Sequence, residues 1–558
     1  MKTMTKTVAA AMILAVYAAS ALTPDEAKKL TQENEGRAQA LMRQIADTCS
    51  RGTPRSAPTR IGTAKDFDGN VVREGKKEWM ATGANVTNDV VASFDGLKQG
   101  FYTLDWSFLD SEGKTLFTHH AAAGITPELG RKVSRKESPY TVWWFGWNHG
   151  SVAHNHIGGP LMQKAGIRKS TWYSPAERSE LDKYDIAPGG VLYGPWRPWG
   201  AMKLSEDEKT ATFNPDKEWE YVVPGSETVD PVTKKKSVKK EKTKDIDLYM
   251  LMTLSNTIAK AKNADITKLH LLYWHESAPG SGTPEELLGL PVPEGLAYGG
   301  ALYDAIWLNK LAEILHKNFP GIELQIGNST HSTGAVKGPM RAGAKPETYD
   351  RVGIETPAQT VMPERLIDCG FQGQQIPLDT AEAITGKRIK ANGAWEFIYR
   401  TSRDLGELKQ AEWYMRDILI ALAHDYFMIA PGVFFDCQTG YYDGLWGGAG
   451  LTYRAPWVYP KPAYVAYAVI TKAMDGAKLS RQFDTGSTTV YAIEYKRCDG
   501  LYATALWCAK GAADFKVKAD DSFLGMGGGG TVVRMLGAEE DLPAGESVVK
   551  GGTSPVYL

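Results

Sequence analysis

The sequence predicts an α/β protein with a central (β/α)8 TIM barrel, flanked by N-terminal and C-terminal β-sandwich domains. Strand-like and helix-like runs alternate over residues 137–478, with eight strand-like runs in all. Short alternating strands without helices occupy 52–136 and 479–558. An open doubly wound sheet is the alternative, but no glycine-rich phosphate-binding turn follows the first strand of the alternating region.

The composition favours a carbohydrate partner over a nucleic acid. The chain has 558 residues, too many for one ordinary core, and 43% of them are hydrophobic. Its net charge of −1 gives no electrostatic case for nucleic acid or an anionic membrane. Sixteen Trp and 25 Tyr are many, and flat aromatic faces with one polar edge suit sugar rings. No feature calls for a cofactor.

The N-terminus predicts export. Lys2 and Lys6 precede an apolar run over 8–19, and Ala19-Ser20-Ala21 offers small residues for cleavage, so 1–21 is a predicted signal peptide. No later run reaches about 18 apolar residues, so we expect no transmembrane segment. The expected location of the mature chain, which begins near Leu22, is periplasmic or extracellular.

Two local patterns define the first part of the mature chain. Residues 22–51 predict an N-terminal amphipathic helix, with Thr23 and Asp25 near its start. The stretch GFYTLDWSFLDSEGKTLF, inside the sandwich domain 52–136, predicts a hairpin with its turn at Asp110–Gly113. The C-terminal sandwich, 479–558, shows the same kind of alternation.

Eight strands and several helices are expected in the barrel. The strands are Thr141–Phe145, Ile167–Thr171, Gly190–Tyr193, Leu269–Trp274, Glu323–Ile326, Arg351–Ile354, Ala394–Phe397 and Gly432–Phe435. The helices include Ile246–Lys262, Ala301–Asn318 and Glu407–His424. The charged run Lys234–Asp245 predicts a solvated insertion leading into a helix, and a site for a glycan anion is the alternative.

Neither cysteine nor histidine spacing predicts a metal site. The five cysteines form no CxxC pair, although Cys498 and Cys508 lie in neighbouring strand-like runs. Those two form a disulfide or are buried free thiols. His149, His154 and His156 are close in sequence, but their spacing matches no helix-borne ligand pair.

The residues that carry chemistry are expected at the carboxyl ends of the barrel strands, where the active site of such a barrel lies. In strand order they are Trp147, His149, Trp199, Trp274, His275, Glu276, His331, Glu355, Glu396 and Asp436. Glu276 on strand four and Glu396 on strand seven lie across the barrel mouth from each other. Two carboxylates about 5 Å apart are what retaining glycoside hydrolysis requires.

Several motifs resemble glycoside hydrolases of clan A, nearest to family 39. LHLLYWHESAPG resembles the strand-four W-N-E-P of the clan, which implies that Glu276 is the acid/base. GAWEFIYRTSRDLGELKQ resembles the strand-seven T-E-F/W-G and its following helix, which implies that Glu396 is the nucleophile. VLYGPWRPW resembles the strand-three segment, and PKPAYVAYAVITKAMDGA the helix that closes the barrel. The resemblance implies an exported retaining hydrolase of poly- or oligosaccharides.

The chain departs from the clan at two positions, and two alternatives stay open, one for the nucleophile and one for the function. His275 replaces the usual Asn and Ser277 the usual Pro, although His can still hydrogen-bond a sugar hydroxyl. Glu355 is the alternative nucleophile. The alternative function is a catalytically inactive glycan-binding protein on the same scaffold, marked by His275. The residues expected to bind substrate, some of which are core residues instead, are His275, Trp147, His149, Trp199, Trp274, His331 and Asp436.

Overall fold

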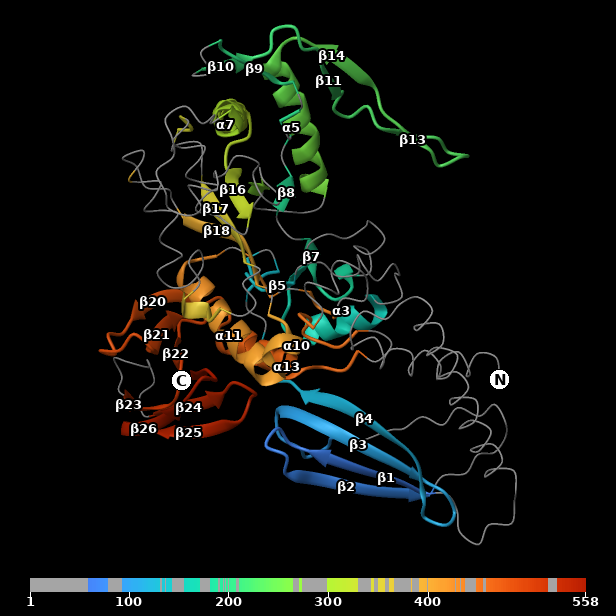
Figure 1. Cartoon of the computed structure of the whole chain (residues 1–558), viewed down its shortest axis with the longest axis vertical. Coiled ribbons are helices and arrows are strands. Elements are labelled where there is room, and N and C mark those ends of the chain that lie inside the picture. Colours follow the sequence, from blue (N-terminus) through green and yellow to red (C-terminus); the bar gives the residue numbers. More distant parts are fainter. Residues whose placement is uncertain are drawn as a thin grey trace. The chain divides into compact units, whose positions relative to one another are not determined.

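The structure is a computed structural model of the whole chain, and it divides into two compact units, Met1–Ile125 and Thr126–Leu558 (Figure 1). It describes residues 59–78, 93–130, 133–135, 137–142, 155–170, 181–188, 191–193, 195, 197–198, 200–206, 210–263, 270–272, 299–329, 343–345, 350–356, 361–365, 383, 391–398, 400–426, 428–431, 433–436, 448–454, 458–519 and 529–558. Within these ranges no helix is long and apolar enough to cross a membrane. The predicted signal peptide and N-terminal helix lie outside them.

The described part of the N-terminal unit is a four-stranded antiparallel sheet in the order β2-β1-β3-β4. Its strands are β1 (Thr59–Lys65), β2 (Val71–Glu78), β3 (Gly100–Leu109) and β4 (Thr115–Ile125). Between β3 and β4 the Gly113 amide donates to the Asp110 carbonyl at 3.1 Å, with Gly113 at φ 81°. The predicted hairpin is therefore confirmed. These strands supply one layer of the predicted sandwich.

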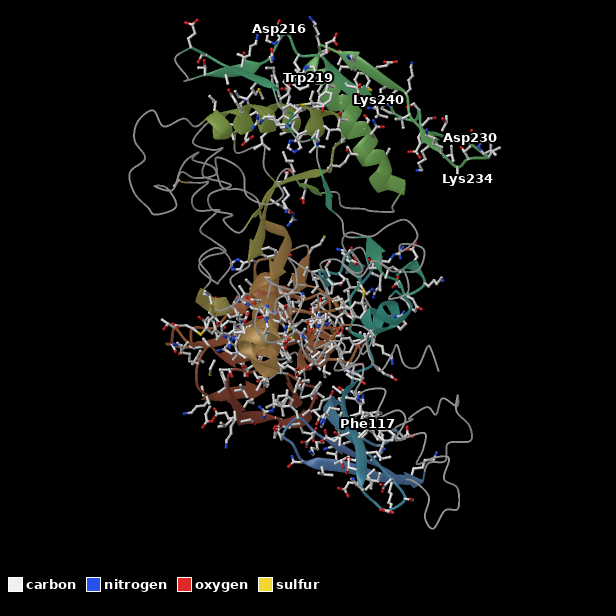
Figure 2. All side chains as sticks on the ribbon, turned by 45° about the vertical axis from the view of Figure 1, so that its right-hand side comes forward. Phe117, Asp216, Trp219, Asp230, Lys234 and Lys240 are labelled. Atoms are coloured by element: carbon white, nitrogen blue, oxygen red, sulfur yellow. The ribbon has the colours of Figure 1, made fainter. Side chains whose placement is uncertain are left out.

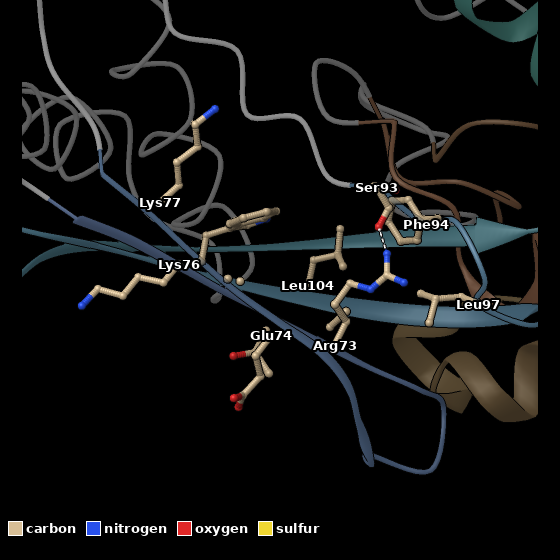
Figure 3. A pocket seen from close by; sticks show the side chains of 13 residues that line it. Arg73, Glu74, Lys76, Lys77, Ser93, Phe94, Leu97 and Leu104 are labelled. Atoms are coloured by element: carbon tan, nitrogen blue, oxygen red, sulfur yellow. Dashed lines mark hydrogen bonds between the residues drawn. The ribbon is translucent and has the colours of Figure 1, made fainter.

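A hollow of about 220 Å³ lies on this sheet (Figure 3). The Trp106 ring lies against Gly62, where an added Cβ would come within 2.3 Å of it, so only glycine fits beneath the indole. At the other end Arg73 donates to the backbone carbonyls of Ser93 and Asp95. The hollow is thus enclosed by β1, β2, β3 and the segment before β3.

Parallel strands form the centre of the second unit. A six-stranded sheet has the order β19-β18-β17-β16-β15-β8, and a three-stranded sheet has the order β5-β6-β7. The strands are β5 (Thr141–Val142), β6 (Lys169–Ser170), β7 (Ala187–Pro188), β8 (Val191–Tyr193), β15 (His270–Leu272), β16 (Glu323–Ser329), β17 (Arg351–Thr356), β18 (Ala391–Ile398) and β19 (Ile429–Pro431). Every pairing in both sheets is parallel. Seven of the eight predicted strands overlap one of these.

The eighth strand lies earlier than predicted. β19 pairs with β18 from Ile429 to Pro431, whereas the sequence predicted Gly432–Phe435. Proline has no N–H to donate to a ladder, so regular pairing ends at Pro431, and Phe435 forms a bridge with Thr452 instead. The apolar run from Met428 onward gave no internal signal for where pairing begins.

Helices connect the strands, and two of them are almost completely buried. They are α3 (Asn155–Lys164), α5 (Ile246–Asn263), α7 (Gly299–Asn318), α10 (Ser402–Leu405), α11 (Glu407–Ala423) and α13 (Pro462–Ala473), with a short 3-10 turn η4 (Pro363–Arg365). α5, α7 and α11 match the predicted helices within two residues at each end. α11 and α13 are buried along nearly their whole length, so each has neighbours on all sides.

The charged run Lys234–Asp245 overlaps a stretch of antiparallel strand pairs, residues 202–243, called the ribbon below. The ribbon is exposed except for core residues such as Met202 and Trp219. It contains β9 (Met202–Leu204), β10 (Ala211–Phe213), β11 (Trp219–Val222), β12 (Thr228–Val229), β13 (Lys236–Ser237) and β14 (Lys240–Thr243). Lys240 pairs with Glu220 at 2.7 Å and Lys242 with Glu218 at 3.3 Å, across the β11–β14 ladder (Figure 2). The predicted solvated insertion before α5 is confirmed. Because these lysines face glutamates, the ribbon offers little positive charge to a glycan anion.

The C-terminal part has two sheets around one core. The larger has the order β20-β21-β22-β27-β24-β25, and the smaller pairs β23 with β26. The strands are β20 (Lys478–Gln482), β21 (Val490–Lys496), β22 (Tyr502–Cys508), β23 (Ala513–Ala519), β24 (Gly529–Arg534), β25 (Glu539–Pro543), β26 (Gly545–Gly551) and β27 (Val556–Tyr557). Phe515 and Val549 of the smaller sheet pack in the same cluster as Leu506 of the larger. Cys498 and Cys508 are both free thiols, so they do not pair.

Candidate active site

The structure describes three of the predicted site residues. Trp147, His149, Trp199, Trp274, His275, Glu276 and His331 lie outside the described residues. For Glu355 and Glu396 the backbone is described, and for Asp436 the side chain as well. The geometry of the site therefore has to be built from the strands that carry these residues.

Glu396 lies near the carboxyl end of one strand, and Glu276 follows another strand of the same sheet in the sequence. Glu396 lies two residues before the last residue of β18, Ile398. β15 ends at Leu272, four residues before Glu276. Since every pairing between β15 and β18 is parallel, the carboxyl ends of these strands share one edge of the sheet. This is the edge at which ligands bind in parallel α/β sheets.

The register of β17 and β18 distinguishes Glu396 from Glu355. Glu396 pairs with Ile354, while Glu355 pairs with Phe397. Between Val352–Ile354 of β17 and Asn392–Glu396 of β18 the register shifts, so β18 is bulged just before Glu396. Bulges are frequent beside active sites, where they redirect one residue of a strand. The two glutamates are thus one step apart in the ladder and are not equivalent positions.

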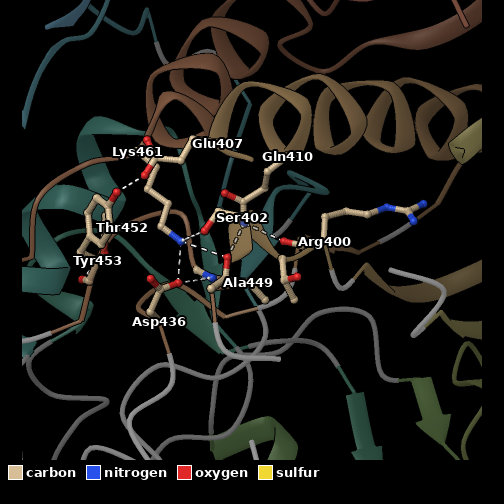
Figure 4. Close-up of polar contacts among 12 residues, drawn as sticks. Arg400, Ser402, Glu407, Gln410, Asp436, Ala449, Thr452, Tyr453 and Lys461 are labelled. Atoms are coloured by element: carbon tan, nitrogen blue, oxygen red, sulfur yellow. Dashed lines mark hydrogen bonds and ion pairs between the residues drawn. The ribbon is translucent and has the colours of Figure 1, made fainter. Parts of the chain in front are cut away.

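Asp436 takes part in a buried ion pair with Lys461 (Figure 4). The Lys461 ammonium donates to Asp436 Oδ1 at 2.6 Å, and the amide of Gly450 donates to the same oxygen at 2.9 Å. The ammonium also donates to Ser402 Oγ at 3.1 Å and to the Gly448 carbonyl at 3.0 Å. A lysine that is 0% exposed needs such partners, because burial without them would cost several kcal/mol.

Lys461 connects three segments that follow strands. Ser402 begins α10 just beyond β18, Asp436 follows β19, and Lys461 is the residue before the first turn of α13. Its ammonium also lies 5.3 Å from the centre of the Tyr453 ring, and the Tyr453 hydroxyl donates to Glu407. Burial raises the pKa of Glu407. The cluster therefore fixes the chain on the carboxyl side of both β18 and β19.

A second buried pair lies beside it, on α11. Arg400 Nε donates to Asp417 Oδ2 at 3.0 Å, and Arg400 Nη1 donates to the Val361 carbonyl at 2.8 Å. Burial raises the pKa of Asp417 to about 6, and the Arg400 charge opposes that rise. Gln410 donates to the Arg400 and Gly448 carbonyls, each at 2.6 Å. The segment that follows β18 is thus held at Arg400 in two ways, through its side chain by Asp417 and through its backbone carbonyl by Gln410.

A third charged pair lies beyond β8. Arg197 Nε donates to Asp304 Oδ1 on α7 at 3.0 Å. Burial raises the pKa of Asp304 to about 6, and Arg197 lowers it in opposition. Sequence analysis selected Trp199 from this segment for its aromatic ring and passed over Arg197. The sequence did contain a signal for Arg197: a single cation stands among Pro and Trp residues just after a strand, and a charged side chain is uncommon among apolar neighbours.

The described side chains offer no metal site. Over those residues, no three of His, Cys, Asp and Glu come close enough together to hold an ion. His149 and His154 lie outside them, as does the side chain of His156.

Comparison with solved structures shows the fold. The chain is similar to a family 39 glycoside hydrolase from the gut symbiont Bacteroides cellulosilyticus WH2, with a TM-score of 0.55 and 15% identity over 90% of this chain and 94% of that one. A β-glucuronidase 2 of Bacteroides uniformis matches with a TM-score of 0.32 and 10% identity, over 90% of this chain and 58% of that one. The second likeness is too weak to carry weight. No family model and no curated protein matches the sequence.

The fold thus supports the resemblance found in the motifs. The mixed α and β elements of this chain match the fold of the family 39 enzyme over 94% of that enzyme's length. At 15% identity the likeness concerns the fold, and the chemistry has to be argued from the residues.

Proposed function

We propose that this protein is an exported, retaining glycoside hydrolase that cleaves O-glycosyl bonds of a poly- or oligosaccharide. The observation that carries the proposal is the position of Glu396, just beyond a bulge and near the carboxyl end of a parallel strand. The family 39 fold supports a glycan substrate. Export follows from the predicted signal peptide at 1–21.

We further propose that the parallel strands close into the eight-stranded barrel. β5 continues the larger sheet at its β19 edge, because Tyr140 forms a parallel bridge with Ile429. At the other edge β7 and β8 belong to one stretch of chain, 187–193, whose first part pairs with β6 and whose second part pairs with β15. Taken as one strand, this stretch joins the two sheets into a ring.

In the proposed mechanism Glu276 and Glu396 divide the work. Glu276 protonates the leaving glycosidic oxygen while Glu396 attacks the anomeric carbon from the opposite face, which forms a glycosyl ester and releases the alcohol. A water molecule then attacks the same carbon and Glu276 accepts its proton, so that the ester bond breaks and Glu396 is regenerated. Two inversions at one carbon give net retention of configuration.

The described residues support this chemistry by holding the strand that carries the nucleophile. Lys461, Ser402 and Gln410 fix the chain within twelve residues after β18, and Asp436 neutralises the buried lysine. A carboxylate has to be placed within about 0.5 Å to attack a bound sugar. Because this support reaches Glu396 through the backbone, these are positioning residues, and Asp436 is kept as a proposed substrate contact.

The experiment compares two variants on aryl glycosides. Glu396→Ala should lose nearly all turnover, and azide should restore part of it with an inverted glycosyl azide as product. Glu276→Ala should retain the first step on substrates with good leaving groups, and azide should give the retained product. The configuration of each product is read by proton NMR.

Three outcomes would change the proposal. If Glu355→Ala behaves as described for Glu396→Ala, the mechanism stands with the nucleophile on β17. If the sugar first released by the unmodified protein has inverted anomeric configuration, retention is wrong. If the protein binds glycans but turns over no aryl glycoside or polysaccharide, it is the inactive binding protein instead.

A further inference from the structure

The turn after β8 presents a positive charge that the fold itself holds in place. Asp304, which is 2% exposed, accepts from Arg197 Nε at 3.0 Å. The guanidinium carbon lies 5.3 Å from the centre of the Tyr303 ring. The Arg197 side chain is 24% exposed, so one end is anchored to a buried acid and the other reaches solvent.

Helix α7 contacts the segment after β8 at two residues, Pro195 and Arg197. Trp307 Nε1 donates to the Pro195 carbonyl at 3.1 Å, and the Trp307 side chain is fully buried. Tyr303, Asp304 and Trp307 occupy adjacent turns of α7, so the backbone and the guanidinium are held by the same rigid element. A ligand that meets a side chain already ordered in this way loses less binding free energy to side-chain ordering.

Most of the hydrogen-bonding capacity of Arg197 is uncommitted among the described residues. Arginine has five N–H donors, and Nε uses one of them on Asp304. Over the described parts of the chain, no hydrogen bond or ion pair involves either terminal nitrogen of Arg197. These two nitrogens form a planar fork that matches a carboxylate or a sulfate ester in a two-point contact.

The sheet register places the strand before Arg197 beside the strand that precedes Glu276 in the sequence. β8 and β15 are parallel neighbours, and Tyr193 pairs with Leu272. Arg197 follows Tyr193 by the same four residues that separate Glu276 from Leu272. Neighbouring strands are about 4.8 Å apart, so β8 and β15, the strands that precede the two segments, end at one level and next to each other.

The strand order also indicates which part of a substrate Arg197 would meet. In the sheet β8 lies on the far side of β15 from β18, the strand that carries Glu396. In the proposed mechanism the leaving group departs toward Glu276, which follows β15 in the sequence. The attacked sugar lies toward Glu396, on β18. A residue beyond β15 is therefore on the leaving-group side.

We propose that Arg197 is a specificity-determining residue that binds an anionic substituent, a carboxylate or a sulfate ester, on the sugar of the leaving-group side. Asp304 is its positioning residue. The assignment to the leaving-group side rests on the proposed function, whereas the anion contact itself rests on the Arg197 geometry alone.

The test measures binding in the full-length protein with Glu396→Gln, which prevents turnover. Isothermal titration compares oligogalacturonides, sulfated carrageenan oligosaccharides and neutral cello-oligosaccharides of equal length. We expect one anionic class to bind at least about tenfold more tightly than the neutral one, and Arg197→Ala to remove that preference. Arg197→Lys should retain part of it, since an ammonium keeps the charge without the fork.

A matched control separates the local contact from overall charge. Arg135 pairs with Asp182 at 3.0 Å, its side chain is 23% exposed, and it precedes β5, away from the carboxyl ends of the strands. Arg135→Ala removes the same charge and should leave the preference for the anionic probe intact. Asp304→Asn should weaken anionic binding although every cation is still present, which a purely electrostatic role would not produce.

Each result has a separate meaning. The preferred anionic probe identifies carboxylate or sulfate. Equal affinities of the parent and Arg197→Ala for all probes, no binding to any probe, or an equal loss in Arg135→Ala would each overturn the proposal. If anion binding depends on Arg197 but the parent protein, with Glu396 intact, shows no turnover, the hydrolase is refuted and the contact stands. Should Arg197→Ala fail to fold, Arg197→Lys and Asp304→Asn still decide.

Discussion

The ribbon and the Lys461 cluster, which lies on the carboxyl side of β18 and β19, each contain an ion pair of nearly the same length. The pair in the ribbon is exposed, and the pair in the cluster is buried. Lys240 and Glu220 lie 2.7 Å apart with side chains 57% and 48% exposed. Lys461 and Asp436 lie 2.6 Å apart with side chains 0% and 13% exposed. Water screens the first pair, whereas the second is buried and makes three further hydrogen bonds to protein atoms. Distance alone therefore says little about how much the fold depends on a pair.

The largest effect is expected from Lys461→Ala. It leaves the Asp436 carboxylate with the Gly450 amide as its one hydrogen-bond donor among the described residues, and breaking a buried pair in this way costs roughly 3–5 kcal/mol of the free energy of unfolding. Urea denaturation followed by tryptophan fluorescence measures the change. The double variant Lys461→Met with Asp436→Asn should recover part of the loss, because no unpaired charge is left. A loss no larger than that of Lys240→Ala would break the comparison.

The next effect concerns Asp304, which is buried although its partner is partly exposed. The pKa of Asp304 in the folded state is about 6, above its ordinary value of 3.8, so its ionisation is harder in the folded chain. The folded state then binds more protons than the unfolded state between these values, and stability falls as the pH rises through this range. The shift corresponds to at most about 3 kcal/mol.

Replacement of Asp304 isolates its contribution to the pH dependence of the free energy of unfolding. Stability is measured by urea denaturation at a series of pH values from 4 to 7, for the parent and for Asp304→Asn. The free energy of unfolding of the parent minus that of Asp304→Asn should fall from about pH 4 to about pH 6 and stay constant above pH 6. Parallel curves would show that Asp304 ionises at its ordinary pKa.

A smaller effect tests how tightly the cluster is packed. A Cβ on Gly450 would lie 2.3 Å from the backbone nitrogen of Asp436, and backbone atoms cannot move aside alone. Gly450→Ala should therefore destabilise the protein by roughly 1–3 kcal/mol. Gly225→Ala is a suitable control in the ribbon, since an added Cβ meets nothing within 4 Å there, although its positive φ adds some strain of its own. If the two glycine variants lose the same amount, the collision at Asp436 is relieved by backbone movement.

The smallest effect is expected from Lys240→Ala. Both partners of this pair are solvated, and their attraction is screened by salt. The urea midpoint should stay within experimental error of the parent value at physiological ionic strength. A clear shift would mean that the ribbon acts as a connected network rather than as separate pairs.

The contrast between the two regions also explains what could be predicted from the sequence. The solvated insertion at Lys234–Asp245, the Asp110–Gly113 hairpin and the helices α5, α7 and α11 were predicted because their signals are local. Each depends on periodicity, turn residues or a change of charge within about 20 residues. The end of β19 was missed because Met428 to Phe435 is uniformly apolar apart from Pro431 and Gly432, and the pairing partner decides where such a run forms a strand.

The site was predicted in part for the same reason. The position of Glu396 on a strand follows from the alternation around it, and the bulge before it does not, because a bulge is a property of two strands. Asp436 was selected for its place after strand eight. Its partner Lys461 is 25 residues further along, between two prolines, and nothing local marks it as buried.

The burial of α11 on all sides has a consequence for how this protein can be divided. The helix supports the turn after β18 through Gln410, and on another side Arg416 Nη2 donates to Glu364, which also accepts from Trp507 of the C-terminal sheet. The Tyr495 hydroxyl donates to the Leu419 carbonyl of the same helix. The C-terminal sheets therefore pack against α11 as part of the same core and are not a separable module. Recombination with a relative would have to exchange α11 together with those sheets, because a junction near 478 would separate the helix from the Tyr495 and Trp507 contacts.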